Sequence, residues 1–117
     1  MKAEFQIFKS TKNGQYYFRL LATNKQIVLA SEGYTTKENC KSGIASVKAH
    51  SPHDCFYHRL TASNGQYYFT LTAANNQVIG VSELYVSLQG RENGIASVKQ
   101  NAPTAVIEDL TGEYAGA

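Results

Sequence analysis

Two short segments of the sequence repeat a set of side chains that can do hydrogen-bonding or acid–base chemistry. The set consists of Ser31, Glu32 and Tyr34 and, later in the chain, Ser82, Glu83 and Tyr85. Each segment lies where a strand is expected to end and a helix to begin, a junction that often holds binding sites. Two carboxylates brought together can share the roles of acid and base, so Glu32 and Glu83 form the one enzymatic arrangement on offer. In the alternative interpretation the serine and glutamate bind turn backbone or the helix N-terminus, and the tyrosine packs at the edge of the core.

A second candidate surface is the face of the predicted sheet that points away from the core. Tyr17, Arg19 and Tyr68 alternate with apolar residues and are expected on this outer face, with Tyr57 and Arg59 as further members. Aromatic and cationic side chains on a sheet can stack the bases of single-stranded nucleic acid. Tyrosine is also a good strand former, which explains the same pattern without a ligand.

The remaining reactive side chains do not form a recognisable site. Cys40 and Cys55 are expected to be free thiols, with Cys40 in the core and Cys55 at the surface. A metal site built from both cysteines with His50 and His53 has spacing that fits no zinc pattern. No glycine-rich nucleotide loop or His-Glu-x-x-His motif is present. We therefore expect no catalytic residues, no metal and no cofactor.

An internal duplication organises the chain. Between Asn13 and Lys48, 19 of 36 residues recur at an offset of 51. Two units of this length suit a closed domain with approximate two-fold symmetry better than a solenoid. The same offset aligns Phe5, Phe56 and Ile107, which predicts strands at 5–9 and 56–60 and a third copy at 105–109. The apolar residues of this third copy, Val106, Ile107 and Leu110, are expected to be buried.

Each unit is predicted to contain three strands followed by a helix. Residues 16–22 and 67–73 alternate with a period of two, and Asn-Gly pairs predict tight turns before them. Helical stripes follow through Cys40, Gly43, Ile44 and Val47 and through Leu88, Gly94, Ile95 and Val98. The predicted fold is α+β: two tandem β-β-β-α-β units share one mainly antiparallel sheet, with two helices packed on one face.

These patterns resemble a known family. The Asn13-Gly14 turn, the strand at 16–20, the segment 31–34 and the helix at 43–48 resemble the YegP-like family of small bacterial proteins in its tandem-repeat form, over residues 5–110. The resemblance implies that the copies share one sheet and exchange their last strands, within a tandem chain or between two single-copy chains. It brings no catalytic activity with it. Leu84 replaces Gly33 and Gly80 replaces Leu29, so a site around the repeated tyrosine is expected to be intact only in the first copy.

Length and composition describe one small folded protein. The chain has 117 residues, of which 43% are hydrophobic and 17% charged, enough apolar material for a core. We expect one domain over 1–117, with repeats at about 3–51 and about 54–110 and a frayed tail at 111–117. The start of the chain lacks an apolar export segment, and no window is long enough to span a membrane. A cytoplasmic protein without a membrane partner is therefore expected.

Charge gives a weak indication of the partner. The net charge of +2 is too small to imply a nucleic acid. Residues 1–51 carry +5 and residues 52–117 carry −3, which could steer a charged partner or a head-to-tail self-contact, although drift after duplication explains it equally well. We predict a monomeric, non-enzymatic interaction module whose partner the sequence does not name, with a protein as one candidate. The alternatives are a weak single-stranded nucleic-acid binder through the outer sheet face and, third, an enzyme using Glu32 and Glu83.

Overall fold

Each half of the chain begins as a three-stranded antiparallel meander, as its alternating residues predict. The computed structural model describes residues 2–112. The strands of the first half are β1 (Glu4–Lys9), β2 (Tyr16–Leu21) and β3 (Ile27–Ala30), and those of the second are β4 (Tyr57–Thr61), β5 (Tyr67–Thr72) and β6 (Val78–Val81). Gly14 and Gly65 have positive φ in the predicted turns, where a residue without Cβ avoids strain.

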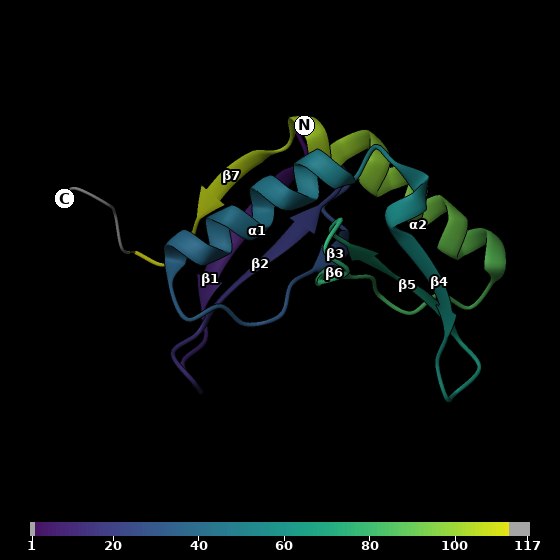
Figure 1. The fold of residues 1–117 in the computed structure, drawn as a ribbon, viewed down its shortest axis with the longest axis horizontal. Coiled ribbons are helices and arrows are strands. Elements are labelled where there is room, and N and C mark those ends of the chain that lie inside the picture. The colour runs from purple at the N-terminus through teal and green to yellow at the C-terminus, as the bar shows by residue number, and fades with distance from the viewer. Residues whose placement is uncertain (1, 113–117) are drawn as a thin grey trace.

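A helix follows each meander. The helices are α1 (Lys37–His50) and α2 (Leu88–Asn101), and both lie on the same face of the sheet (Figure 1). Thr36 and Ser87 cap them, because each hydroxyl oxygen accepts a hydrogen bond from an amide in the first turn. The predicted stripes are buried except at Leu88, which is 54% exposed. That part of the prediction was wrong, because Leu88 is the first residue of α2 and no strand of the described residues covers it.

The two halves join edge to edge in the middle of one sheet. The strand order is β4-β5-β6-β3-β2-β1-β7, and Ala30 of β3 pairs with Val81 of β6 at the junction. These two residues occupy the same position in the duplication, so an approximate two-fold axis passes between them. The last strand, β7 (Val106–Asp109), returns from α2 to pair in parallel with β1 of the first half. The predicted element order, the α+β fold and the exchange of the last strand are confirmed.

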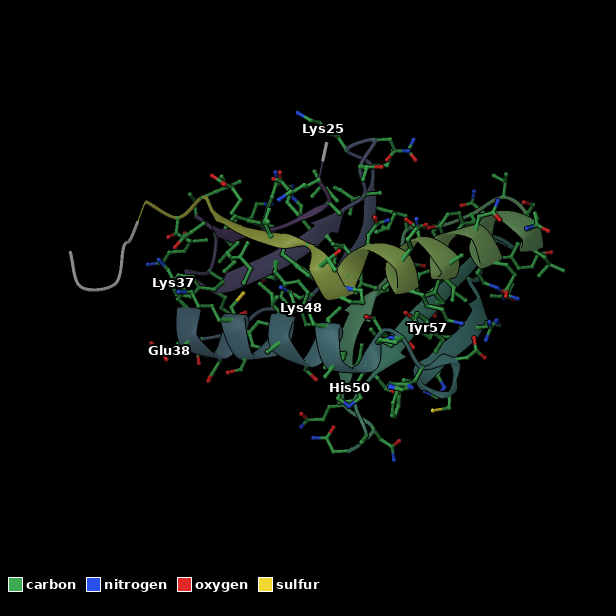
Figure 2. All side chains as sticks on the ribbon, turned by 90° about the horizontal axis from the view of Figure 1, so that it is seen from above. Lys25, Lys37, Glu38, Lys48, His50 and Tyr57 are labelled. Atoms are coloured by element: carbon green, nitrogen blue, oxygen red, sulfur yellow. The ribbon has the colours of Figure 1, made fainter. Side chains whose placement is uncertain are left out.

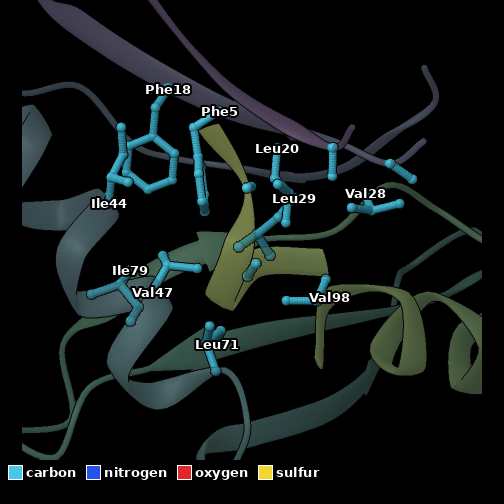
Figure 3. Packing of buried hydrophobic residues seen from close by; sticks show 14 of the residues in the cluster. Phe5, Phe18, Leu20, Val28, Leu29, Ile44, Val47, Leu71, Ile79 and Val98 are labelled. Atoms are coloured by element: carbon cyan, nitrogen blue, oxygen red, sulfur yellow. The ribbon is translucent and has the colours of Figure 1, made fainter. Parts of the chain in front are cut away.

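The core lies between the sheet and the helices (Figure 3). Phe5, Phe18 and Leu20 from the first half are fully buried, as are Phe69 and Leu71 from the second. α1 contacts β5 and β6 as well as β2, and α2 contacts β3 as well as β5. Because each helix covers strands of both halves, the two units share one core.

The first strands of the two halves differ in register by one residue relative to the offset of 51. Phe5 pairs with Leu20, whereas the equivalent Leu71 pairs with Tyr57. The prediction that Phe56 matches Phe5 was therefore wrong, and the strand expected at 56–60 begins at Tyr57. A shift of one residue turns side chains to the other face of a sheet. Tyr57 and Arg59 consequently face the helices, and they do not belong to the outer face as expected.

The end of the chain pairs as predicted but buries less than predicted. Val106 and Ile107 are each 45% exposed and Leu110 is 49% exposed, because β7 is an edge strand with no described strand on its far side. Ala105 is the residue that becomes buried. Thr111 donates two hydrogen bonds to Asp109. Residues 113–117 of the expected frayed tail lie outside the described residues.

Candidate functional site

Both repeated serines are engaged by the backbone around them. The Ser31 hydroxyl oxygen accepts a hydrogen bond from the Phe18 amide at 2.9 Å and donates to the Glu32 carbonyl at 2.9 Å. Ser82 repeats this arrangement with Phe69 and with the carbonyl of the following residue. The serines therefore tie the end of β3 or β6 to the neighbouring strand. Both hydroxyls bond to backbone groups, which are not bases that would make a serine a nucleophile.

Both repeated tyrosines pack beneath a helix. The ring of Tyr34 stacks on Phe18 at 6.2 Å between centroids, and Tyr85 stacks on Phe69 at 6.4 Å. The tyrosine hydroxyls lie against Gly43 and Gly94, where an added Cβ would overlap them. Burial, followed by nearby negative charge, raises the pKa of both phenols. The two helix glycines leave room for these rings.

The repeated glutamates line two shallow hollows related by the two-fold axis. The first, of about 400 Å³, is lined by Glu32, Gly33, Tyr34, Gln77, Val78 and Ile79. The second, of about 440 Å³, is lined by Lys25, Gln26, Ile27, Val28, Glu83 and Tyr85. Each hollow thus combines the glutamate and tyrosine of one half with the third strand of the other. Sequence reasoning found the glutamates and tyrosines but missed the opposing strand, because the order of strands in the sheet was unknown.

The structure does not bring Glu32 and Glu83 together. Each lies two residues beyond the central Ala30–Val81 pair, and the two strands run in opposite directions. The two positions are therefore separated by about 13 Å along the strands, four residues at roughly 3.3 Å each. Each carboxylate lies in a different hollow, so they do not form a paired acid and base.

The outer face carries an ordered aromatic group at its first-half end. Tyr17 stacks on Phe8 with centroids 5.7 Å apart, and the Arg19 guanidinium lies 4.9 Å from the centre of the Phe8 ring. Arg19 Nε donates to Gln6 Oε1 at 2.8 Å, and Gln6 donates to Glu4. We call Phe8, Tyr17 and Arg19 the aromatic platform. Sequence reasoning missed Phe8, although it follows the buried Ile7 along β1 and therefore lies on the opposite face of the strand.

The second-half end of this face lacks the platform. Tyr68 pairs with Leu60, which takes the position of Phe8, and Thr70 takes the position of Arg19. Leu60, Leu84 and Val86 are exposed, Val86 by 84%. Tyr17, Arg19 and Tyr68 are thus not one continuous stacking surface, since the cation and second ring occur only beside Tyr17.

The cysteines and histidines are dispersed, as far as residues 2–112 show. Cys40 is buried and Cys55 exposed, as predicted. Burial, together with the charge of Asp109, raises the pKa of the Cys40 thiol to about 11. His50 accepts a hydrogen bond from the Ala74 amide at Nε2, and its Nδ1 lies 2.8 Å from the Ser46 carbonyl. Among the described residues no group of three or more histidine, cysteine or acidic side chains is placed to hold a metal ion.

Ion pairs that the sequence did not reveal lie at both edges of the sheet. Lys37, on the β7 side of α1, binds Asp109 at 2.8 Å (Figure 2). Although partial burial raises the pKa of Asp109, hydrogen bonds from Lys37 and Thr111 lower it to about 2. At the opposite edge, Arg59 binds Glu92 at 2.9 Å and Asp54 at 3.0 Å. These pairs join segments distant in sequence, so spacing gives no sign of them.

The fold and these surfaces define a class: tandem-repeat α+β proteins in which two halves share one sheet and place two equivalent hollows at their junction. A family model described as a domain of unknown function, DUF1508, matches residues 11–57 and again 62–109. The chain belongs to this family, in its tandem YegP-like form, which confirms the resemblance inferred from the sequence.

Related proteins and structures agree with this assignment. A UPF0339 protein of Bordetella pertussis is 55% identical over 97 residues, covering 83% of this chain and 87% of the relative. UPF0339 protein YegP of Escherichia coli K12 is 47% identical over 111 residues, covering 95% and 100%. The solution structure of E. coli yegP, described as a protein of unknown function, superposes with a TM-score of 0.90 at 46% identity and covers 97% of both chains. A Shewanella oneidensis UPF0339 structure gives 0.89 at 43% identity, covering 98% and 97%.

The helices of the described region are short. Neither α1 nor α2 has the length and apolar character required to cross a membrane.

Proposed function

We propose that this protein is a non-enzymatic interaction module that acts as a cytoplasmic monomer and binds a protein partner at its two hollows. The observation that carries the proposal is the repeated geometry of these hollows. In each, an exposed glutamate and a tyrosine from one half face the third strand of the other half. A duplicated chain thereby offers two related openings to a partner.

The same geometry argues against an enzyme. The serine hydroxyls are bound to backbone, and burial keeps both phenols protonated by raising the pKa of Tyr34 and Tyr85. Glu32 and Glu83 lie in separate hollows, so neither has the other to divide acid and base roles. Within the described residues, these groups are arranged to support the fold and to present two carboxylates.

The chemistry of the hollows favours a basic and aliphatic partner segment. In the first hollow Glu32 lies beside Val78, which is 41% exposed. The second hollow is lined by Lys25 as well as Glu83, so it carries a cation in addition to the carboxylate. A lysine or arginine of the partner is therefore expected to prefer the Glu32 hollow, while aliphatic side chains can contact either.

The test is affinity capture of the tagged chain from the native lysate, with and without nuclease. We expect one protein to be recovered in stoichiometric amount despite nuclease. Glu32→Gln should reduce recovery more than Glu83→Gln, and the control Glu38→Gln, an exposed glutamate on α1, should not change it. Recovery that survives Glu32→Gln combined with Glu83→Gln, or that disappears with nuclease, contradicts the proposal.

A weak single-stranded nucleic-acid binder is the second candidate, and the aromatic platform supports it. The stacked pair of Phe8 and Tyr17 beside Arg19 has the composition of a base-stacking surface. The aromatic platform is small, which favours a protein partner over a nucleic acid. Glu108 also brings acidic charge to the first-half edge, because it pairs with Gln6 of β1.

A further inference from the structure

The first strands of the two halves differ in whether another strand pairs with their outward edge. β7 pairs with the edge of β1 that faces away from β2. The Val106 amide donates to the Ala3 carbonyl, and the Leu110 amide donates to the Ile7 carbonyl. β4 is the last strand at the opposite end, and no strand of residues 2–112 pairs with its outer side. The two-fold axis that relates β1 to β4 therefore leaves β4 without the strand that covers its counterpart.

The residues that would contact this missing strand differ in character between the halves. In the first half Ile7 and Cys40 are fully buried, and Asp109 of β7 pairs with Ile7. The pairing of the hairpins places Arg59 where the first half has Ile7, and the repeat offset places Arg91 where it has Cys40. Two apolar positions beneath a covering strand have thus become arginines at an uncovered edge.

The two arginines share one glutamate, and Arg59 also binds Asp54 at 3.0 Å. Arg59 Nε lies 3.0 and 2.9 Å from the two carboxylate oxygens of Glu92, and Arg91 Nε lies 3.3 Å from one of them. Arg91 also donates to the Leu60 carbonyl on β4 and lies 5.6 Å from the centre of the Tyr67 ring. We call Arg59, Arg91 and Glu92 the edge cluster.

We infer that the edge cluster prevents β4 from pairing with β4 of a second copy of this chain. Arg59 is a charged side chain on the helix side of an edge strand, a placement that opposes strand addition. A strand added beside β4 would exclude water from both arginines and from the carboxylates that bind them, and removing charges from water is costly even when they are paired. This inference concerns self-association and does not depend on the hollows.

A second copy is the relevant occupant because every molecule carries the same edge. Antiparallel pairing of β4 with β4 obeys a two-fold axis, so each edge would satisfy the other without leaving a further edge open. The position beside β4 can accept a strand in principle, since its counterpart beside β1 does so within this chain. The edge cluster is what distinguishes the two positions.

The test replaces the cluster by uncharged side chains. We expect Arg59→Ile with Arg91→Ala and Glu92→Gln to associate into dimers between micromolar and millimolar concentration in sedimentation velocity, while the wild type stays monomeric. Hydrogen exchange should show new protection of the backbone amides of β4 in the dimer. The control Lys12→Ala with Lys41→Ala and Glu38→Gln changes the same number and sign of exposed charges in the first half and should remain monomeric.

A further variant distinguishes the effect of removing the edge charges from the effect of unfolding. Arg59→Lys keeps a positive charge beside Glu92 and Asp54 and should remain monomeric, with unchanged circular dichroism. If the triple variant unfolds, Arg59→Ile alone should still associate at a lower concentration than the wild type. A folded triple or single variant that stays monomeric at millimolar concentration overturns the inference, as does a wild type that dimerises with protection of β4.

Discussion

Leu29 and Gly80 occupy the same position in the two halves, next to the two-fold axis, and only one of them can be large. Leu29 is fully buried. A Cβ added at Gly80 would lie 2.5 Å from Leu29 Cδ2, 2.6 Å from its Cγ and 2.9 Å from its Cδ1. Carbon atoms at optimal separation are about 3.5–4.0 Å apart, so the leucine would have to move by roughly 1 Å in a packed core.

We therefore expect Gly80→Ala to lower the free energy of unfolding by about 1–3 kcal/mol, the usual cost of overpacking. Leu29→Ala alone should cost about 2–5 kcal/mol, because it leaves a cavity. In the Leu29→Ala background the new methyl group enters vacated space, and the penalty of Gly80→Ala should vanish. The double variant should then be more stable than the sum of the single effects by about 1–3 kcal/mol.

Urea unfolding, followed by tyrosine fluorescence and circular dichroism, measures the stability of the wild type, of both single variants and of the double variant. Val47→Ala provides the control, since this buried residue on α1 is not among the atoms nearest Gly80. The cost of Gly80→Ala should persist in that background. If Gly80→Ala is neutral, or costs the same in the wild type as in the Leu29→Ala background, the close approach at the axis does not govern stability and the reasoning fails.

Three further predictions concern β7, the thiols and the outer face. Asp109 has a folded pKa of about 2, below its ordinary 3.8, so its ionised form stabilises the fold above pH 3.8 and loses this effect as the pH falls toward 2. Asp109→Asn should cost about 1–2 kcal/mol at neutral pH, and its difference from the wild type should shrink over that acidic range in urea unfolding; a pH-independent difference contradicts this. In a native thiol titration Cys55 should react far faster than Cys40, which is buried and has a pKa of about 11; equal rates would count against the assigned burial. Labelled single-stranded RNA or DNA at low salt should bind weakly, and Tyr17→Ala should weaken binding while Tyr68→Ala does not; micromolar binding that both variants weaken would favour the nucleic-acid function.

The order of elements was predictable from the sequence because the signals are local. Alternation marks the strands, Gly14 and Gly65 mark the turns, and the helical spacing around Ile44 and Ile95 marks the buried stripes. The register of β4 was missed because the second hairpin turn is one residue shorter, and sequence identity begins only at the turn. Burial of Val106 and Ile107 was overestimated, since an apolar residue does not reveal whether its strand lies at an edge.

The candidate site was only partly predictable. Ser31, Glu32 and Tyr34 were identified from repetition, but their contacts depend on which strands become neighbours. The third strands of the two halves meet antiparallel at Ala30 and Val81, and this single pairing separates Glu32 from Glu83 and creates the hollows. Identity between repeats shows that a residue is retained, whereas its role follows from the symmetry axis.

Several differences between the halves lie where the symmetric arrangement cannot be kept. At the axis, two leucines would collide, and the second half has Gly80. At the edges, one β7 cannot cover both β1 and β4, and the second half has Arg59 and Arg91 where the first has buried apolar residues. Beside the platform, Gly33 leaves no room for a side chain because Gln15 and Tyr17 lie against it, whereas Gln66 turns toward Asn64 and the second half accommodates Leu84. These exchanges have steric or solvation causes. Glu32 and Glu83 are exposed and remain identical in both halves, as the proposed binding at the two hollows requires.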